Sequence, residues 1–286
     1  KKSIDIKFVR PAHKLVALHG EHVLKIKTLE LTSGQFSDGH RFLGEKEIKI
    51  SNADDYEKQL QESGKVIPNF ELRKAKIKNE LDKKTDSCEL VINEDLLNEI
   101  TALCEWPTVY EGYFDKEFLS IPDECLTLTM QKNQKFVPLK TKENQLSNKF
   151  LIVSNIYTHN PKNIIEGNER VLKARLSDAQ FFFNLDKKKN FEDSVKKLSK
   201  VIYHNKLGNN YDRTLRLVSL TSKWGNFLGL DKKLCERAAL LSKADLTSRM
   251  VDEFPELQGI MGRYYAKFSG DNTEICSAIE EHYKPK

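Results

Sequence analysis

The segment from residue 160 to 189 most constrains how this chain can fold, because it combines one apolar stripe with many cationic side chains. Asn160 can cap a helix, and Pro161 suits the first helical position, where its missing N–H costs nothing. Apolar residues then recur with a spacing close to 3.6 residues, at Ile164, Ile165, Val171, Leu172, Leu176, Ala179 and Phe183. This pattern predicts a helix with one face packed on a core and the other in water.

The water-facing side of the predicted helix carries charges that differ in their available partners. Glutamates stand four residues before Arg170 and Lys173, a spacing that allows ion pairs on a helix. Arg175 and the lysines at 187–189 have no such obvious partner. An ordinary solvated surface would explain these charges, whereas a polyanion such as a nucleic acid would use the unpaired ones to bind phosphate.

The composition allows a nucleic-acid partner without requiring one. The net charge of +5 over 286 residues is only mildly basic. Because 31% of the residues are charged and no long uncharged apolar run occurs, we expect a soluble protein without a membrane span. The five cysteines include no CxxC pair, which argues against a disulfide framework or a zinc knuckle and favours reduced thiols in the cytoplasm.

The order of local patterns predicts a mixed region followed by helices, in about two domains. A glycine turn at 19–22 predicts a hairpin within 15–31. Helices are expected at 56–62, 70–81 and 94–103, strands at 106–114, 136–139 and 150–156, and a further helix after Pro122. After 191 only helical spacing remains, first at Phe191, Val195, Leu198 and Ile202, and then in segments at 217–228, 231–241 and 273–283.

Long collinear blocks carry a family resemblance that spans nearly the whole chain. They are FVRPAH at 8–13, DGHRFLG at 38–44, GKVIPNFELRKAKI at 64–77, EWPTVYEGYF at 105–114, TLTMQKNQKFVP at 127–138, NPKNIIEGNERVLKARLSDAQFFFNLDKKK at 160–189, KVIYHNKLGNNYDR at 200–213, AALLSKADLTSRMVDEFPELQGIMGRYYA at 238–266 and EEHYKPK at 280–286. These blocks resemble the beta subunit of bacterial two-subunit glycyl-tRNA synthetase. Compared with that family, we expect the chain to lack an N-terminal portion and the C-terminal anticodon-binding domain.

The resemblance implies an α+β fold: a mixed B3/B4-like α/β sandwich at 1–190, and an all-helical, degenerate HD-like domain at 191–286 that we expect to be truncated. In this family the alpha subunit, a class II catalytic core, activates ATP and glycine, and the beta subunit supplies most of the grip on tRNA(Gly) in an α2β2 assembly. We therefore expect a cytoplasmic component of an aminoacyl-tRNA synthetase with no catalytic residue, metal or cofactor of its own and no independent activity.

The B3/B4-like region is expected to contact RNA rather than to edit it. The related module of phenylalanyl-tRNA synthetase edits mischarged tRNA, but no pocket can sieve out a proteinogenic amino acid smaller than glycine. Compact polar groups in turns could instead meet phosphate or ribose, namely Arg10, His13, His40 and Arg41. The alternative is that the two arginines pair with carboxylates such as Asp38 and only hold loops.

The segment 214–246 resembles the HD-domain phosphohydrolase fold, but the metal-binding residues of that fold are missing. Arg213 stands where the first histidine belongs, and Ser242 and Lys243 stand where the His-Asp pair belongs. Arg and Lys side chains donate hydrogen bonds but accept none, and their positive charge repels a metal ion. We therefore expect a phosphate-facing groove in which Lys206 also takes part. Alternatively, Ser242 and Lys243 simply finish a helix, near whose carboxyl end a lysine is favourable.

The sequence predicts a set of tRNA contacts, and two other functions remain open. The predicted contacts are Arg10, His13, His40, Arg41, Arg170, Lys173, Arg175, Lys206, Arg213 and Lys243. The aromatic runs 181–183 and 264–265 could stack on bases or fill the core. The alternative functions are an HD-type phosphohydrolase and a tRNA-editing hydrolase. His19 and His22 could suggest a metal, but no third ligand is near them in the sequence.

Overall fold

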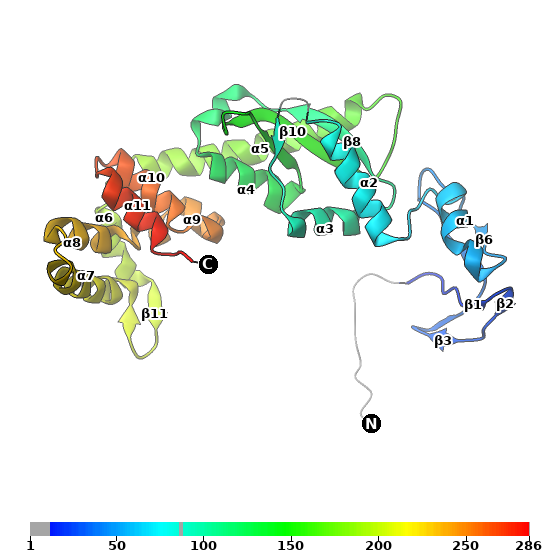
Figure 1. The fold of residues 1–286 in the computed structure, drawn as a ribbon, viewed down its shortest axis with the longest axis horizontal. Helices are drawn as coiled ribbons and strands as arrows, with labels where there is room; N and C mark the ends of the chain where they lie inside the picture. Colours follow the sequence, from blue (N-terminus) through cyan, green and yellow to red (C-terminus); the bar gives the residue numbers. More distant parts are fainter. Residues whose placement is uncertain (1–11, 86–87, 286) are drawn as a thin grey trace. The chain divides into compact units, whose positions relative to one another are not determined.

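The computed structural model describes residues 12–85 and 88–285, and the chain divides into two compact units. The first unit comprises residues 1–113 and 135–169, and the second comprises 114–134 and 170–286. Both units mix helices with small antiparallel sheets, in agreement with the predicted α+β class (Figure 1). The compact units do not follow the predicted division at 190, which stays a prediction about domains.

The first unit begins with short hairpins and a helix. Its elements are β1 (Leu18–His19), β2 (His22–Val23), β3 (Lys27–Thr28), β4 (Leu31–Thr32), β5 (Phe36–Ser37), β6 (Ile48–Lys49), η1 (Ala53–Asp55) and α1 (Tyr56–Glu62). The hairpin predicted around the glycine turn is confirmed, because β1 pairs with β2 and Gly20 takes the positive φ of 58° that such a turn requires. Ile48, Ile50 and Leu60 form a small buried cluster beside it.

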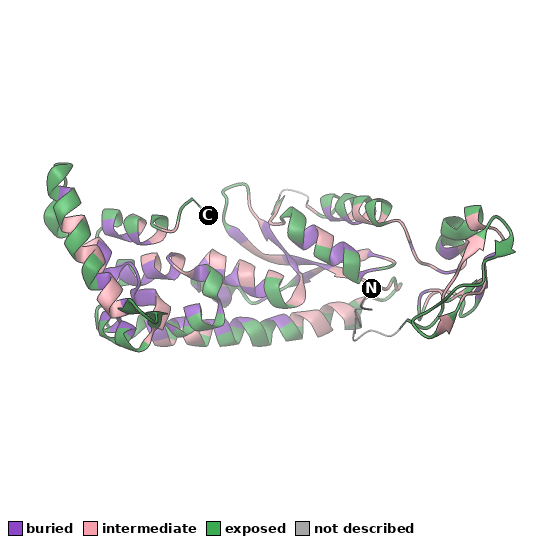
Figure 2. Ribbon diagram, turned by 90° about the horizontal axis from the view of Figure 1, so that it is seen from below, coloured by how far each residue is buried: buried purple, intermediate pink, exposed green. Residues whose placement is uncertain are grey.

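A four-stranded antiparallel sheet forms the core of the first unit, in the order β7-β9-β10-β8. The strands are β7 (Glu89–Leu90), β8 (Thr108–Tyr113), β9 (Val137–Lys140) and β10 (Leu146–Ser154), and the helices packed on them are α2 (Phe70–Asp82) and α3 (Glu94–Leu103). Buried side chains of both helices join those of the strands in one cluster. Figure 2 colours the buried residues of the chain purple. The predicted cap is confirmed, because the Asn93 side chain accepts from the Leu96 N–H at 2.8 Å.

The second unit is mainly helical. Its elements are η2 (Lys116–Ser120), α4 (Asp123–Gln134), the later part of α5 (Lys162–Lys187), α6 (Asp193–Lys197), η3 (Leu198–Lys200), β11 (Ile202–His204), β12 (Gly208–Asn209), α7 (Asn210–Phe227), α8 (Lys232–Leu241), η4 (Ala244–Thr247), α9 (Arg249–Glu253), η5 (Pro255–Leu257), α10 (Ile260–Phe268) and α11 (Thr273–Glu281). The predicted helix from 160 is confirmed as α5, whose stripe is buried at Leu172, Leu176, Ala179 and Phe183. The predicted stripe is wrong at Val171, which is exposed, and Ile164 and Ile165 are only half-buried.

The prediction that only helices follow residue 191 is wrong at the β11–β12 hairpin. Phe191, Val195 and Leu198 are buried as their spacing predicts, but Ile202 is 76% exposed in a strand. The chain reverses in the turn at 205–207, and Gly208 directly after it has a φ of 85° that suits a residue without a Cβ. Helical spacing alone could not locate this end, because a strand residue can continue the period by coincidence.

The segment 114–134 belongs to the second unit through contacts between α4 and α10. The Glu124 carboxylate accepts from the Arg263 guanidinium at 2.8 Å and from the Tyr264 hydroxyl at 2.9 Å. Cys125 Sγ lies 3.3 Å from Met261 Sδ in the core. These contacts explain why a segment inserted between two strands of the first unit packs with helices far along the chain.

Gly112 and Gly167 provide a stability test of the first unit. Gly112 pairs with Phe150 across β8 and β10, and a Cβ there would lie 2.8 Å from Phe150 Cζ, whereas one on Gly167 meets nothing within 4 Å. We expect Gly112→Ala to lower the free energy of unfolding by about 1–3 kcal/mol. Gly167→Ala, inside α5, should raise it by about 0.5–1 kcal/mol.

The measurement is urea unfolding followed by Trp106 fluorescence in a Trp224→Phe background, because Trp106 lies in the same unit. Equal stability of the two alanine variants would contradict the close approach of Gly112 to the phenylalanine ring.

Candidate nucleic-acid interface

The ion pairs predicted along α5 do not form. Glu166 pairs with Lys162 at 3.8 Å, and the Glu169 carboxylate accepts from the Tyr113 backbone N–H at 2.8 Å. The prediction was wrong because it considered only partners four residues further along the helix. Arg170 is exposed and has no ion pair within residues 12–85 and 88–285.

Lys173 and Arg175 lie on the same helix but differ in how the fold uses their charge. Lys173 pairs with Asp115 at 2.7 Å, and this hydrogen bond raises the pKa of the lysine. Arg175 is exposed, lines a cavity, and has no hydrogen bond or ion pair in the part of the chain that the structure describes. Of the two, Arg175 has the uncommitted charge.

The lysine run after α5 is partly engaged by the second unit. Lys189 pairs with the buried Asp186 at 2.7 Å, and Lys187 Nζ lies 4.3 Å from the centroid of the Phe268 ring. Lys188 is exposed and unpaired as far as residues 12–85 and 88–285 are concerned. The expectation that the whole run lacks partners is therefore wrong for Lys189, because Asp186 stands three residues before it, a spacing at which helical side chains meet.

Lys243 and Arg213 come together as the sequence suggested, in a cluster that also includes His282 and Tyr283. We call these four residues the cationic cluster. Lys243 follows α8 and is 4% exposed, with Nζ 2.7 Å from His282 Nε2 and 3.8 Å from the centroid of the Tyr283 ring. Arg213, on α7, is half-buried and close enough to Lys243 for their charges to interact. Because Lys243 is enclosed, Arg213 is the more accessible cation of the two.

The protonation state of the cationic cluster follows from its hydrogen bonds. His282 Nδ1 lies 2.7 Å from the Ile279 carbonyl oxygen, which can only accept, so Nδ1 carries the proton and Nε2 accepts from Lys243. Burial lowers the pKa of His282, and Lys243 lowers it further. Burial, followed by repulsion from Arg213, lowers the pKa of Lys243 to about 8, while Asp245 acts in the opposite direction.

Asp245 is the buried carboxylate whose charge reaches Lys243. Its Oδ2 atom accepts from the backbone N–H groups of Gly259 at 2.6 Å and Gly262 at 3.3 Å. Burial raises the pKa of Asp245 to about 6 against these hydrogen bonds. Within residues 12–85 and 88–285, no three His, Cys, Asp or Glu side chains gather as they would around a metal ion.

The hairpin that sequence analysis missed carries Lys206 and a platform for Arg213. Lys206 is exposed in the turn between β11 and β12, and its backbone N–H donates to His204 Nδ1 at 3.1 Å. The Arg213 guanidinium carbon lies 4.2 Å from the centroid of the Tyr203 ring. The strands therefore hold one predicted cation and orient another.

His40 has a structural position in the first unit. It is 3% exposed, and its Nε2 lies 2.6 Å from the Asn155 carbonyl oxygen, to which it donates. Its Nδ1 accepts from the N–H groups of Phe42 and Leu43, both at 3.2 Å. Since both ring nitrogens are used inside the chain, we leave His40 out of the proposed interface.

The other predicted contacts of the first unit are at its surface or outside the described residues. His13 and Arg41 are exposed, and Arg10 lies outside the described residues. The carboxylate of Asp38, the alternative partner predicted for Arg10 and Arg41, pairs with Lys14 at 2.6 Å. Arg41 has only a ring contact, 5.5 Å from the centroid of Phe42, among residues 12–85 and 88–285.

Sequence reasoning missed two groupings of cations with aromatic rings. Trp106 has Lys76 Nζ at 4.3 Å and Lys65 Nζ at 5.7 Å from a ring centroid. The second grouping is the cationic cluster, in which the sequence assigns no role to His282 and Tyr283 beyond their place in the matching block at 280–286. No spacing rule could have found either grouping, because each joins residues that are distant along the chain. The described helices include none long and apolar enough to cross a membrane.

An α+β chain with arginines left unpaired on exposed helices presents the kind of surface that nucleic-acid-binding proteins use. The sequence model of the glycyl-tRNA synthetase beta subunit matches residues 2–286. The chain belongs to this family.

Curated relatives agree with this assignment. The glycine–tRNA ligase beta subunit of Neisseria meningitidis serogroup A is 50% identical over 281 residues, which make up 98% of this chain and 41% of that protein. Those of Methylobacillus flagellatus and Ralstonia nicotianae are 49% and 47% identical, covering 99% of this chain and 40% of each protein. The chain thus spans about two fifths of the length of these relatives.

Replacing Lys243 by Met should change how stability depends on pH. The pKa of Lys243 is about 8 in the folded chain against an ordinary 10.5, so the unfolded chain binds more protons between these values and stability rises with pH there. Lys243→Met should remove this rise. The unchanged chain gains stability over this range and the variant does not. The free energy of unfolding of the variant minus that of the unchanged chain should therefore fall by roughly 1–2 kcal/mol from pH 7.5 to 9.5.

Urea unfolding at both pH values measures this, and the difference cancels the effect of buried thiols such as Cys104, whose pKa is raised to about 11. The exposed Lys188→Met serves as the control and should behave like the unchanged chain. A difference for Lys243→Met that does not vary with pH would show that its ammonium is not held in the buried environment described above.

Proposed function

We propose that this chain is part of the beta subunit of a two-subunit glycine–tRNA ligase. In this proposal it contributes tRNA binding to the ATP-dependent attachment of glycine to tRNA(Gly). The alpha subunit, in an α2β2 assembly in the cytoplasm, activates glycine with ATP, and this chain holds no cofactor. Membership of the family and the names of the relatives support the proposal. The B3/B4-like and HD-like assignments of 1–190 and 191–286 are part of it.

The observation that carries the tRNA-binding role is the set of cations that the fold leaves uncommitted. Arg170 on α5 and Lys206 on the β11–β12 turn have no ion pair within the described ranges, and Arg213 rests on a tyrosine ring. Arg175 also has no ion pair there, but it shares a cavity with the carboxylates of Asp178 and Glu253. Phosphate oxygens are the partners that planar guanidinium groups bind best.

Within this proposal Lys243 supports the interface rather than touching the tRNA. Its ammonium is enclosed by His282 and Tyr283, so a phosphate could not reach it without displacing them. Its charge nevertheless adds to the positive potential around Arg213. The substitution of Arg213 and Lys243 for metal ligands also makes a hydrolase the weaker proposal, because both groups repel a divalent cation.

A reconstitution experiment tests the function as a whole. The natural polypeptide that carries this sequence is mixed with the alpha subunit of the same organism, and transfer of labelled glycine to tRNA is followed. Transfer that requires both proteins is expected. Hydrolysis of phosphate esters or of mischarged tRNA by this polypeptide alone, without glycine transfer in the mixture, would favour a hydrolase instead.

Single substitutions test the interface. Arg170→Met and Arg213→Met should each weaken tRNA binding about 3- to 10-fold at low salt and reduce the slope of log affinity against log salt by about one, as expected for one lost phosphate contact. Filter binding of labelled tRNA at several salt concentrations measures both quantities.

The control is Lys232→Met, an exposed lysine of α8 whose charge is paired with Glu236 at 3.8 Å. It should bind tRNA like the unchanged protein. If all three variants bind equally, the arginines of α5 and α7 are not part of the interface.

A further inference from the structure

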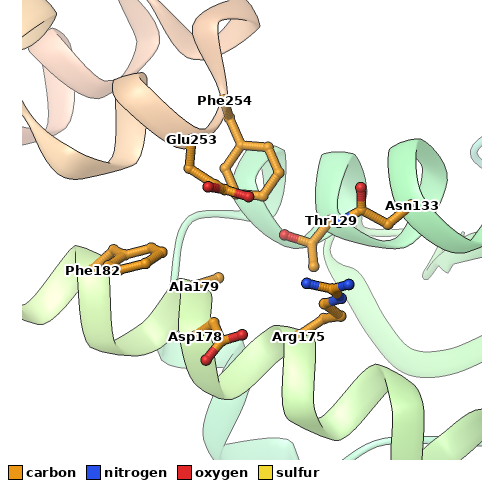
Figure 3. Close-up of a pocket in the computed structure, with 8 residues that line it drawn as sticks. All are labelled: Thr129, Asn133, Arg175, Asp178, Ala179, Phe182, Glu253 and Phe254. Atoms are coloured by element: carbon orange, nitrogen blue, oxygen red, sulfur yellow. The ribbon is translucent and has the colours of Figure 1, made fainter.

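A small polar cavity lies within the second unit, between α4, α5 and the end of α9 (Figure 3). Its volume is about 160 Å³. Arg175 and Phe182 line it from α5, Asn133 from α4, and Glu253 and Phe254 from the end of α9. Arg175 and Phe182 are seven residues apart on α5 and therefore share one face of the helix, and only the fold brings Glu253 and Asn133 to the same cavity.

The charged side chains around this cavity are not paired with one another. Arg175, Asp178, Glu253 and the amide of Asn133 have no hydrogen bond or ion pair within the ranges 12–85 and 88–285, although opposite charges line the same space. In Figure 3 the Arg175 guanidinium and the Glu253 carboxylate approach the cavity from opposite sides. The Arg175 guanidinium, which donates hydrogen bonds, therefore faces the Glu253 carboxylate, which accepts them, across the cavity.

The remaining lining residues are Ala179, Phe182, Phe254 and Thr129, whose hydroxyl already donates to the Cys125 carbonyl oxygen, and the phenylalanine rings suit a flat ligand. Phe182 is half-buried and lines the cavity, while the adjacent Phe183 packs in the core with its ring centroid 5.8 Å from that of Phe268. Ala179 is buried and lies between the charged groups and Phe182 on α5 (Figure 3). Sites for drug-sized molecules begin at roughly 300 Å³, so this cavity has room for one ring system and not for a whole nucleotide.

A free anion is a poor match, because Asp178 and Glu253 would repel it from the same cavity that Arg175 lines. A small amino acid would satisfy the charges but leave the aromatic wall without a contact. Guanine satisfies both features. Its O6 and N7 atoms accept from an arginine fork, and its N1–H and N2–H₂ groups can donate to a carboxylate, whereas adenine offers no such pair of edges.

We propose that this cavity binds a single guanine base, with Arg175 on the O6/N7 edge, Glu253 on the N1/N2 edge and Phe182 against the ring. The sugar and phosphate stay outside. The base could belong to a free guanine nucleotide or to an unpaired guanosine of an RNA, and only the second source rests on the proposed function.

The test is calorimetric titration of the whole chain with the 5′-monophosphates of guanosine, inosine and adenosine. The guanosine nucleotide should bind at least tenfold more tightly than the adenosine nucleotide. The inosine nucleotide, which lacks the N2 amino group, should fall between them. Equal binding of all three, no binding, or displacement of the guanosine nucleotide by glycine would overturn the proposal.

Variants locate the site. Glu253→Gln and Arg175→Met should each weaken binding of the guanosine nucleotide at least tenfold, and Glu253→Gln should also reduce the preference over inosine. Arg249→Met, which alters an exposed arginine outside the cavity, should change nothing. Both altered residues of the cavity lack partners among residues 12–85 and 88–285, and circular dichroism verifies that the variants fold. Unchanged binding in both variants would place the guanine elsewhere and overturn the assignment.

Two further measurements are needed. Binding of short RNAs shows whether the base comes from RNA or from a free nucleotide, and binding of tRNA tests the proposed function independently of the cavity. If the RNA UUGUU binds more tightly than the free nucleotide and than UUAUU, the base comes from RNA. If UUGUU binds more weakly than the free guanosine nucleotide, and if the Glu253→Gln variant binds the two equally, the ligand is the nucleotide. Loss of guanine selectivity with tRNA binding intact refutes only the cavity. Guanine binding without tRNA binding refutes only the RNA source and the proposed function.

Discussion

The second unit depends on the buried carboxylate of Asp186, which joins the end of α5 to two later helices. Its Oδ2 atom accepts from the Met250 backbone N–H at 3.0 Å and from the Tyr265 hydroxyl at 3.4 Å, and its Oδ1 atom accepts from Lys189 at 2.7 Å. A buried carboxylate is tolerated only when such partners replace water. Because these bonds set how α5 meets α9, they also determine that Arg175 and Glu253 line one cavity.

The fold divides the cations of this chain into those that already have partners and those that do not. Lys173 and Lys189 are committed to carboxylates, and Lys243 is enclosed by a histidine and a tyrosine. Arg170 and Arg175 are left free within the described ranges. A net charge of +5 could not have revealed this distribution, since pairing depends on which segments meet and not on how many charges exist.

Local signals predicted the elements well wherever the chemistry is local. The cap at Asn93, the start of α5 and the turn at Gly20 follow from side chains that act on their own backbone. The hairpin after residue 201 was missed, because Ile202 continued a helical period and only Gly208 marked the reversal. The ion pairs expected on α5 failed because partners from other segments were closer. Of the candidate cavity, the sequence singled out Arg175 and the phenylalanine run, but nothing in it related them to Glu253.

The sequence by itself determined the family, the α+β class and most helix boundaries, because long matching blocks, capping residues and apolar periods are properties of neighbouring residues. Only the tertiary structure decided which charges remain available. Lys173 meets Asp115, and Lys243 meets His282, through contacts between distant segments. The energy of a charge depends on its burial and on the groups within a few ångströms of it, and both quantities exist only after the chain has folded.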